Sequence, residues 1–395
     1  MSERREVWIT GVGLLTCLGE GLEAAWSRLD HGDPPSYDDK SFAPYIVHQL
    51  PPMSFDKHIP KKSDQRQMET WQRVGVYTAG MALTDAGIAG NAELLDRADM
   101  IVAAGGGERD TAVDTAIMAG MRKTNTRGAF LNERLMSDLR PTLFLAQLPN
   151  LLAGNISLVH GVVGSSRTFM GEEAAGVDAV RVAQARIAAG QSELTLVGGA
   201  YNGTRWDVLL AFELGGVVLK DKFAPVWDRG PGGGIAFATM GAFLVFESSD
   251  HAKARGAKPR ARISQVLSDR NARKGGEAEA SLRRQWNTLA PQLDRSHAAV
   301  ISGASGFEPA TSSEQSVLKE VGLPVRNTGT YIGHGVDTQF MANLGIGCAA
   351  IEHRKLFVPT GTGDFGDSPA DLSQIVVTSV GNWRGEGLAL LERVN

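Results

Sequence analysis

The sequence predicts an α/β fold, in which strands alternate with helices. Short apolar runs of strand length are separated along the chain by segments whose apolar residues recur at helical spacing. Glycines follow several of the strand-like runs, and this alternation is typical of sheets with parallel pairing. With 395 residues, of which 43% are hydrophobic and 21% charged, the chain is long enough for one large layered unit or two domains.

The first half opens with a buried strand, Val7–Val12, bounded by Gly11 and Gly13. Residues 67–86 carry apolar side chains at helical spacing and stop before Gly87, which predicts an amphipathic helix with one face in the core. The other elements expected in this half are strands at 98–104, 194–197 and 242–246 and helices at 21–29, 148–156 and 174–189.

Three segments of the first half lack a regular pattern. Residues 33–66 are rich in proline and predict loops, and residues 225–234 form a glycine-dense loop. Residues 109–145 are polar with short helical patches, which predicts an insertion or cap.

The strand and helix pattern starts again after Gly256, which ends a short helix. We expect strands at 261–266, 298–301, 374–378 and 388–391 and helices at 278–293, 313–321 and 338–354. The two halves have a similar order of elements, but their sequences show a repeat only faintly.

Composition excludes several classes of function. The net charge of −4 argues against bulk nucleic-acid binding, and no apolar run approaches the ~20 residues of a membrane span. We expect no signal peptide, and the two cysteines fit a reducing compartment, so we also expect a cytoplasmic protein. Zinc-ligand spacings are absent, and Gly105–Gly107 lacks the spacing of a phosphate-binding loop, so we expect neither metal nor cofactor.

The segment around Glu173 is the most informative one. Two motifs serve as anchors, His160-Gly161 before it and Gly198-Gly199-Ala200 after it. A count forward from the first and a count back from the second both lead to Glu173. The segment resembles the nucleophile elbow of the β-ketoacyl-[acyl carrier protein] synthases of the thiolase superfamily, in which that position holds a cysteine. The resemblance implies the thiolase fold, a duplicated five-layered α-β-α-β-α core. It also implies halves at 1–256 and 257–395, with the cap at about 109–145 inserted in the first.

The family's chemistry uses that cysteine, two histidines, a lysine and a mobile Gly-Phe-Gly-Gly loop that gates acyl admission. The cysteine needs the positive end of a helix to become a thiolate, and the histidines stabilise developing negative charge. In register with these positions the chain has Glu173 for the cysteine, Ala304 for the first histidine, His334 for the second, Gly329 for the lysine, and Gly381, Asn382 and Trp383 for the gating loop.

Each of these residues also has a plain structural interpretation. Glu173 could form a buried ion pair, with Arg167 or Arg384 as partner, instead of acting in catalysis. His334 could be a satisfied pocket or core histidine. Cys348 lies on an apolar helix face and is expected to be inert, and Cys17 stands in a turn with no partner evident in the sequence.

Lys61, Lys62 and Arg66 lead into the helix expected at 67. The resemblance places them in the region where family members dock the acidic acyl carrier protein, whose carboxylates and phosphate basic side chains can meet. The alternative is an ordinary solvated face.

A chain that keeps the scaffold motifs of the family but lacks its catalytic residues resembles the chain-length-factor class, the non-condensing partner of an active ketosynthase. That class has a Gln or another residue at the cysteine position, and Glu173 is not the usual Gln. The first hypothesis is therefore a degenerate subunit of fatty acid or polyketide-type elongation, a heterodimer with an active ketosynthase, with a homodimer also possible. The alternatives are a divergent 3-oxoacyl-[acyl carrier protein] synthase, an acyltransferase in which Glu173 and His334 act as acid and base, and an acyl-binding scaffold protein.

Overall fold

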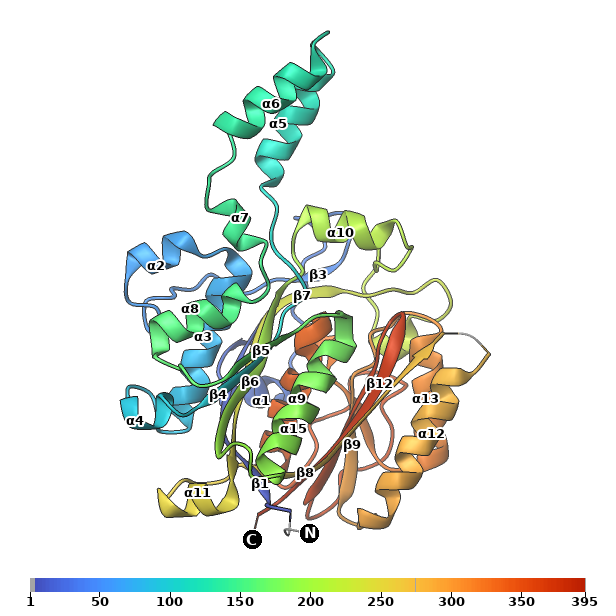
Figure 1. Ribbon diagram of the computed structural model, residues 1–395. Helices are drawn as coiled ribbons and strands as arrows, with labels where there is room; N and C mark the ends of the chain where they lie inside the picture. The colour runs from blue at the N-terminus through green and yellow to red at the C-terminus, as the bar shows by residue number, and fades with distance from the viewer. Residues whose placement is uncertain (1–3, 274, 395) are drawn as a thin grey trace.

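The computed structural model describes residues 4–273 and 275–394, and its centre is one large mixed sheet (Figure 1). Ten strands follow each other in the order β10-β9-β11-β12-β8-β1-β7-β6-β4-β5, while β2 pairs with β1 and β3 with β7. The strands are β1 (Val7–Thr16), β2 (Gly19–Glu20), β3 (Val47–His48), β4 (Asp99–Ala103), β5 (Ser166–Phe169), β6 (Leu194–Asn202), β7 (Phe237–Ser248), β8 (Ala261–Ala272), β9 (Ala298–Ser302), β10 (Val325–Asn327), β11 (Gln374–Val380) and β12 (Arg384–Glu392).

The two halves of this sheet repeat one strand order. The first is β5-β4-β6-β7-β1 and the second is β10-β9-β11-β12-β8; in each, two parallel pairings are followed by two antiparallel ones. The expectation of parallel pairing is therefore right for only half of the sheet. One cause is visible between β11 and β12, because so short a connection cannot make the crossover that parallel strands require. The predicted boundary at 256/257 lies between α11 and β8, and the division into domains stays a prediction.

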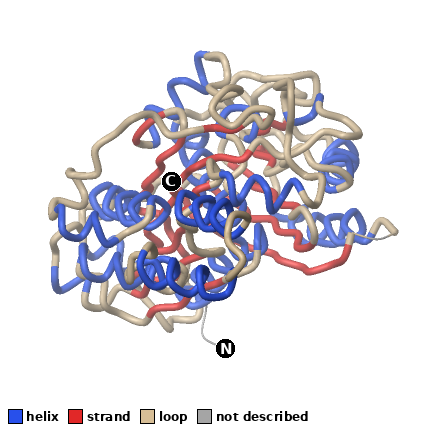
Figure 2. Tube along the Cα trace, turned by 90° about the horizontal axis from the view of Figure 1, so that it is seen from above, coloured by secondary structure: helices blue, strands red, loops and turns tan. Residues whose placement is uncertain are grey.

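Helices lie outside and between the two half-sheets, which gives the five-layered core (Figure 2). On the outside, α3 and α8 cover the first half-sheet, and α12 and α13 the second; α9 and α15 pack between the two half-sheets. The helices are α1 (Leu22–His31), α2 (Lys62–Gln67), α3 (Thr70–Asp85), α4 (Ala92–Leu95), α5 (Thr111–Met121), α6 (Arg127–Ser137), α7 (Leu143–Ala146), α8 (Leu151–His160), α9 (Glu172–Ala188), α10 (Trp206–Glu213), α11 (Ser249–Ala254), α12 (Glu277–Leu289), α13 (Ala310–Val321), α14 (Gly329–Ile332) and α15 (Gln339–Glu352), with short 3-10 turns at Val226–Asp228, Ala290–Gln292 and Val336–Thr338.

The central helix α15 shows how the sequence makes this layer. Every residue from Gln339 to Ile351 is buried, and the helix carries glycines where neighbouring elements come closest. A Cβ atom at Gly347 would lie 2.8 Å from a methyl of Leu391. Small residues therefore let the helix approach the strands, in agreement with the burial expected for this segment.

Several helix boundaries differ from the expected ones. The helix expected from 67 begins at Thr70, because Glu69 caps it with a reciprocal hydrogen-bonded box and Met68 is extended. The proline-rich region 33–66 contains β3 and the start of α2, and α10 was not expected at all. In the described residues no helix is long and apolar enough to cross a membrane.

The cap expected at about 109–145 consists of α5, α6 and α7, of which α5 and α6 form a hairpin that projects from the body (Figure 1). The two helices of this hairpin bury very little. Ile117 is the only buried residue of α5, and α6 has none.

Candidate functional site

Glu173 lies in the first turn of α9, in the layer between the half-sheets. Gly171 (φ 128°) and Glu172 (φ 53°) make the sharp turn that leads into the helix. The Glu173 side chain is 5% exposed. The positive end of the helix favours a carboxylate at this position.

His334 is the hydrogen-bond partner of Glu173. The distance between His334 Nε2 and Glu173 Oε1 is 3.1 Å, although the residues are 161 positions apart in the chain. The backbone of His334 is held beside β7, because its N–H donates to the carbonyl of Ala236 and its carbonyl accepts from the N–H of Ala238. Both side chains are buried, so water does not screen this pair.

The environment keeps Glu173 ionised. Burial acts to raise the pKa of its carboxyl group, but the hydrogen bond and the charge of His334, with the backbone N–H groups of Glu173 and Asn382, outweigh burial. The pKa therefore lies below its ordinary value, and the group is a carboxylate at neutral pH. A carboxylate so held is a hydrogen-bond acceptor and cannot form a thioester.

The arginines expected as partners of Glu173 are not its partners. Arg167 lies on an exposed part of β5, and the Nε of Arg384 lies 3.7 Å from a carboxylate oxygen of Glu172 instead. Consecutive residues of a helix point in directions about 100° apart, so Glu172 points toward Arg384 while Glu173 points toward His334. The buried pair proposed as the structural alternative for Glu173 is therefore present, but its partner is His334 and neither of the two arginines.

Asp337 is a site residue that the sequence analysis missed. It is 1% exposed, and its Oδ2 has no hydrogen-bond partner within the described residues. Burial, together with the nearby charge of Glu173, raises the pKa of Asp337 to about 7, against a weak hydrogen bond from Thr338. Its place three residues after His334 was the available signal, but nothing in the sequence says that a carboxyl there is buried.

Ala304 and Gly329, the positions expected to have lost a histidine and a lysine, lie next to each other. The amide of Asn327 donates to the carbonyl of Ala304 at 3.0 Å. A Cβ atom at Gly329 would lie 3.2 Å from that carbonyl, from Asn327 Oδ1 and from a methyl of Val226. A longer side chain at position 329 would therefore crowd the backbone of Ala304 and the side chains of Asn327 and Val226.

The expected gating loop is the turn between β11 and β12, and it lies directly against Glu173. A Cβ atom at Gly381 would lie 3.2 Å from Glu173 Oε2. Asn382 is buried, and neither polar atom of its amide has a partner in the described part of the chain. Trp383 is half exposed and stacks on Phe212, with ring centroids 5.5 Å apart.

Cys17 has a partner that the sequence did not reveal. Its Sγ lies 3.7 Å from His48 Nδ1 and donates to the carbonyl of Tyr331. Burial raises the pKa of Cys17 to about 12 and lowers the pKa of His48 to about 3. A neutral thiol beside a neutral imidazole is not an activated nucleophile. Cys348 is fully buried in α15, as expected.

Lys61, Lys62 and Arg66 are exposed at α2. Lys62 forms an ion pair with Asp56. Within residues 4–273 and 275–394, no three His, Cys, Asp or Glu side chains come together in a way that could hold a metal ion.

Comparison with known sequences places the chain in a family. Residues 4–250 match the profile of the Beta-ketoacyl synthase, N-terminal domain. The chain belongs to this family. It is 25% identical over 268 residues to 3-oxoacyl-[acyl-carrier-protein] synthase 2 of Vibrio cholerae, covering 65% of this chain and 61% of the relative. It is 26% identical over 274 residues to Nodulation protein E of Rhizobium leguminosarum bv. trifolii, covering 66% of this chain and 63% of the relative. These matches span about three fifths of each relative's length.

Solved structures confirm the thiolase fold over nearly the whole chain. A β-ketoacyl synthase from Burkholderia phymatum superposes with a TM-score of 0.79 at 17% identity, covering 99% of this chain and 100% of the other. The ishigamide ketosynthase/chain length factor superposes with the same TM-score of 0.79 at 18% identity and the same coverage, 99% and 100%. The correspondence of individual site residues to the family's catalytic positions stays a prediction.

Proposed function

We propose that this chain is a non-condensing, chain-length-factor-like partner of an active ketosynthase in fatty acid or polyketide-type acyl elongation. The observation that carries the proposal is the ionised Glu173, buried at the start of α9 and hydrogen-bonded to His334 where the family's cysteine is expected. A condensing enzyme must form a thioester at that position, and a carboxylate acceptor cannot.

The surroundings support the same conclusion. Enolate stabilisation requires donors aimed at developing negative charge, and Ala304 supplies none. His334 donates to Glu173 and is engaged by it. A single substitution, Glu173→Cys, is therefore expected not to restore condensation, because Ala304 and Gly329 still lack donors.

The partner would be a second chain of the same fold. Strand β5 is an edge strand that pairs with β4 alone among the described strands, and unpaired edge groups can pair with another chain. Exposed apolar side chains flank this strand, among them Leu158, Val163 and Met170. Isolated exposed apolar residues are common, but a group of them beside an open edge supports an interface.

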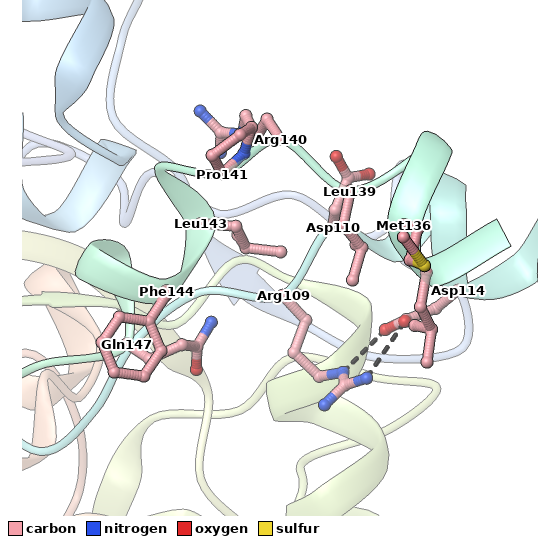
Figure 3. Close-up of a pocket in the computed structure, with 11 residues that line it drawn as sticks. Arg109, Asp110, Asp114, Met136, Leu139, Arg140, Pro141, Leu143, Phe144 and Gln147 are labelled. Atoms are coloured by element: carbon pink, nitrogen blue, oxygen red, sulfur yellow. Dashed lines mark hydrogen bonds and ion pairs between the residues drawn. The ribbon is translucent and has the colours of Figure 1, made fainter. Parts of the chain in front are cut away.

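The cap offers further apolar surface for the same partner. Between α5, α6 and α7 lies a groove of about 570 Å³ (Figure 3). Its walls include the exposed side chains of Leu135, Met136 and Phe144, and its rim carries the ion pair of Arg109 with Asp114. A helical hairpin that buries almost nothing within its own chain gains stability when a partner covers it.

The heterodimer is tested by native mass spectrometry of this chain mixed with candidate ketosynthases. We expect a 1:1 complex, and no acyl adduct on this chain after incubation with an acyl-loaded carrier protein. A stable adduct on this chain would contradict the proposal. A chain that binds acyl groups but copurifies with no ketosynthase would instead be the acyl-binding scaffold.

Docking of the acyl carrier protein at α2 is tested separately. The triple variant Lys61→Glu/Lys62→Glu/Arg66→Glu is expected to weaken binding to the carrier protein, because it reverses the charge that meets acidic side chains. Lys319→Glu/Lys355→Glu, on surfaces away from α2, is the control. Unchanged binding by the triple variant would remove the docking assignment.

A second function is favoured by Asp337, which is buried with no hydrogen-bond partner for its Oδ2 in the described residues, and whose pKa is raised to about 7 by burial and the nearby charge of Glu173. A carboxyl group that titrates near neutrality is suited to acid-base catalysis, for example hydrolysis of an acyl group without a covalent intermediate. The test uses the purified chain alone with malonyl- and acyl-loaded carrier protein. Release of free acid that Asp337→Asn abolishes would support this activity over the non-condensing role.

A further inference from the structure

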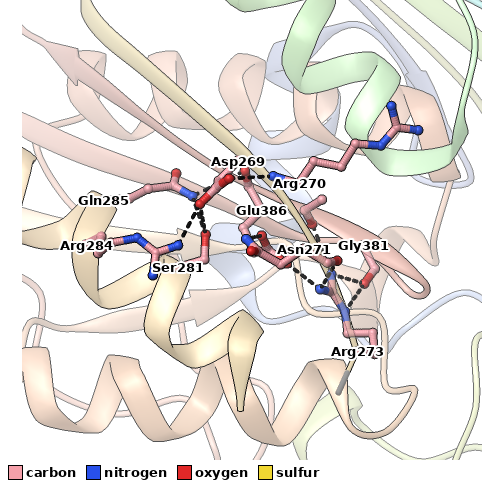
Figure 4. Close-up of polar contacts among 10 residues, drawn as sticks. Asp269, Arg270, Asn271, Arg273, Ser281, Arg284, Gln285, Gly381 and Glu386 are labelled. Carbon is pink, nitrogen blue, oxygen red and sulfur yellow. Dashed lines mark hydrogen bonds and ion pairs between the residues drawn. The ribbon is translucent and has the colours of Figure 1, made fainter. Parts of the chain in front are cut away.

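One largely buried arginine, Arg273, holds the turn that links β11 to the first residues of β12; residues 381–385 are here called the 381–385 turn. The Nε of Arg273 donates to the carbonyl of Gly381 at 2.9 Å, and a terminal nitrogen donates to the carbonyls of Gly381 and Gly385 at 2.5 and 3.0 Å. The other terminal nitrogen forms an ion pair with Glu386 (Figure 4). Arg273 therefore grips both sides of the turn.

The contacts of Arg273 are shielded from solvent, and its ion-pair partner Glu386 is held by a further hydrogen bond. The side chain of Arg273 is 9% exposed and that of Glu386 is not exposed at all. The amide of Asn271 donates to the second carboxylate oxygen of Glu386 at 3.0 Å, which leaves Glu386 fully engaged. A buried charge pair of this kind resists separation, because either partner would be left as an unpaired buried charge.

The glycines allow the turn to lie close to its neighbours. A Cβ atom at Gly381 would lie 2.3 Å from the carbonyl oxygen of Arg384, and at Gly385 (φ 89°) it would lie 2.7 Å from the Cβ of Ala174. The N–H of Gly381 donates to the carbonyl of Gly385 at 2.8 Å, which closes the turn. The turn thus lies directly over the start of α9.

The other face of the turn rests on the site. A Cβ atom at Gly381 would lie 3.2 Å from Glu173 Oε2, Trp383 stacks on Phe212, and Arg384 faces Glu172. The turn is therefore held from both faces, although the side chains of Trp383 and Arg384 remain half exposed. This is the reverse of what a mobile gating loop requires, which is few buried contacts.

We propose that Arg273 is a positioning residue that, with Glu386, fixes the 381–385 turn closed over Glu173. The turn is then a static wall, and an acyl-pantetheine arm does not reach position 173 of this chain past it. This goes beyond the proposed function, since a subunit that cannot condense could still admit an acyl arm. Any acyl chain bound by the proposed heterodimer would therefore enter through the site of the partner ketosynthase.

Access is measured with a cysteine reporter at the covered position. Glu173→Cys is treated with iodoacetamide, and the alkylation rate of each cysteine is followed by peptide mass spectrometry. We expect labelling at position 173 to be at least tenfold faster in Glu173→Cys/Arg273→Ala than in Glu173→Cys. Buried Cys17 and Cys348 are internal controls, since their labelling rises only if the whole chain unfolds.

The matched control is Glu173→Cys/Arg284→Ala. Arg284 belongs to the same polar network through Asp269 but is largely exposed and makes no contact with the turn (Figure 4). It should label at the parent rate. Equal rates for the Arg273 and Arg284 variants would overturn the proposal. If Arg273→Ala also exposes Cys17, Glu386→Gln replaces it and is judged by the same comparison.

A second readout keeps Glu173 in place. Hydrogen exchange at the Gly381 amide should accelerate at least tenfold in Arg273→Ala, while exchange in α15 stays unchanged. Arg273→Lys should recover only part of the protection, because one ammonium group does not reproduce the planar fork that contacts two carbonyls and Glu386. An unchanged Gly381 amide would refute the positioning role. Neither measurement needs a carrier protein or a ketosynthase, so a failure here leaves the proposed function standing.

Discussion

Replacing Glu173 by Gln tests whether the buried contact with His334 stabilises the ionised carboxylate. Gln has the same shape and can still accept a hydrogen bond from His334 Nε2 through its amide oxygen. The substitution therefore removes the charge while keeping the contact, which spans 3.1 Å between two side chains that are 3% and 5% exposed.

The magnitude follows from that burial. A hydrogen bond to a charged group contributes about 1.5–3 kcal/mol, against about 0.5–1.5 kcal/mol for a neutral pair. The variant should fold but lose roughly 1–2 kcal/mol of unfolding free energy at pH 7.5. With a urea m value of about 3 kcal/mol/M, the midpoint falls by roughly 0.3–0.7 M.

Urea unfolding followed by circular dichroism measures this shift, with Glu172→Gln as the matched control. Glu172 carries the same chemical change one residue away, but its partner Arg384 is 3.7 Å distant and half exposed. Such a pair contributes about 0–1 kcal/mol, so the midpoint of the control should barely move.

The pH dependence supplies a second condition. The pKa of Glu173 is lowered in the folded state, so its contribution is present above the unfolded pKa of about 4.3 and is lost as the pH falls through the folded pKa. The difference between wild type and Glu173→Gln should therefore be full at pH 7.5 and shrink below pH ~4. Equal stabilities at pH 7.5, or a difference that grows in acid, would refute the reasoning.

Three further outcomes are expected. Burial raises the folded pKa of Asp337 to about 7, so the stability of wild type falls as the pH rises from the unfolded pKa of about 4 to the folded pKa. Asp337→Asn should therefore gain on wild type between pH ~4 and 7, by about 4 kcal/mol at most, and keep that gain above pH 7, as thermal unfolding across pH can measure. Cys17, with its pKa raised to about 12, should resist iodoacetamide at pH 8 in the folded protein and react in urea, as peptide mass spectrometry can report. Gly333→Ala should cost about 1–3 kcal/mol in urea unfolding, because φ is 67° and the new Cβ would lie 2.6 Å from His48.

The sequence predicted the layered α/β architecture because the spacing of apolar residues along the chain indicates each helix and strand. Apolar periodicity located the buried α15 and most strands, and the resemblance to the family, through its His-Gly and Gly-Gly-Ala motifs, placed Glu173 at a helix start. Helix starts were less accurate, since the start of α3 depends on a side-chain cap at Glu69 that competes with the apolar pattern.

The site was less predictable because its contacts are long-range. Glu173 stands at the start of α9, and His334 stands in a segment whose backbone pairs with β7. The two residues come together only when α9 and that segment meet in the core, and no local sequence pattern predicts this. The neighbour of Cys17 is likewise 31 residues away. The burial of Asp337 was hidden for the same reason, since an aspartate after a glycine-rich stretch is usually exposed.

The repeated strand order also governs when the sheet can form during synthesis. In the first half-sheet β1 gains its long partner only when β7 is made, because Val7 pairs with Ser248. At about 5–20 residues per second, β1 waits roughly 10–50 s for that partner. Closing so long a loop costs about 3 kcal/mol more entropy than closing a ten-residue hairpin. The first strand of the nascent chain is therefore an apolar segment that must be kept from other chains until the last strand of its half emerges.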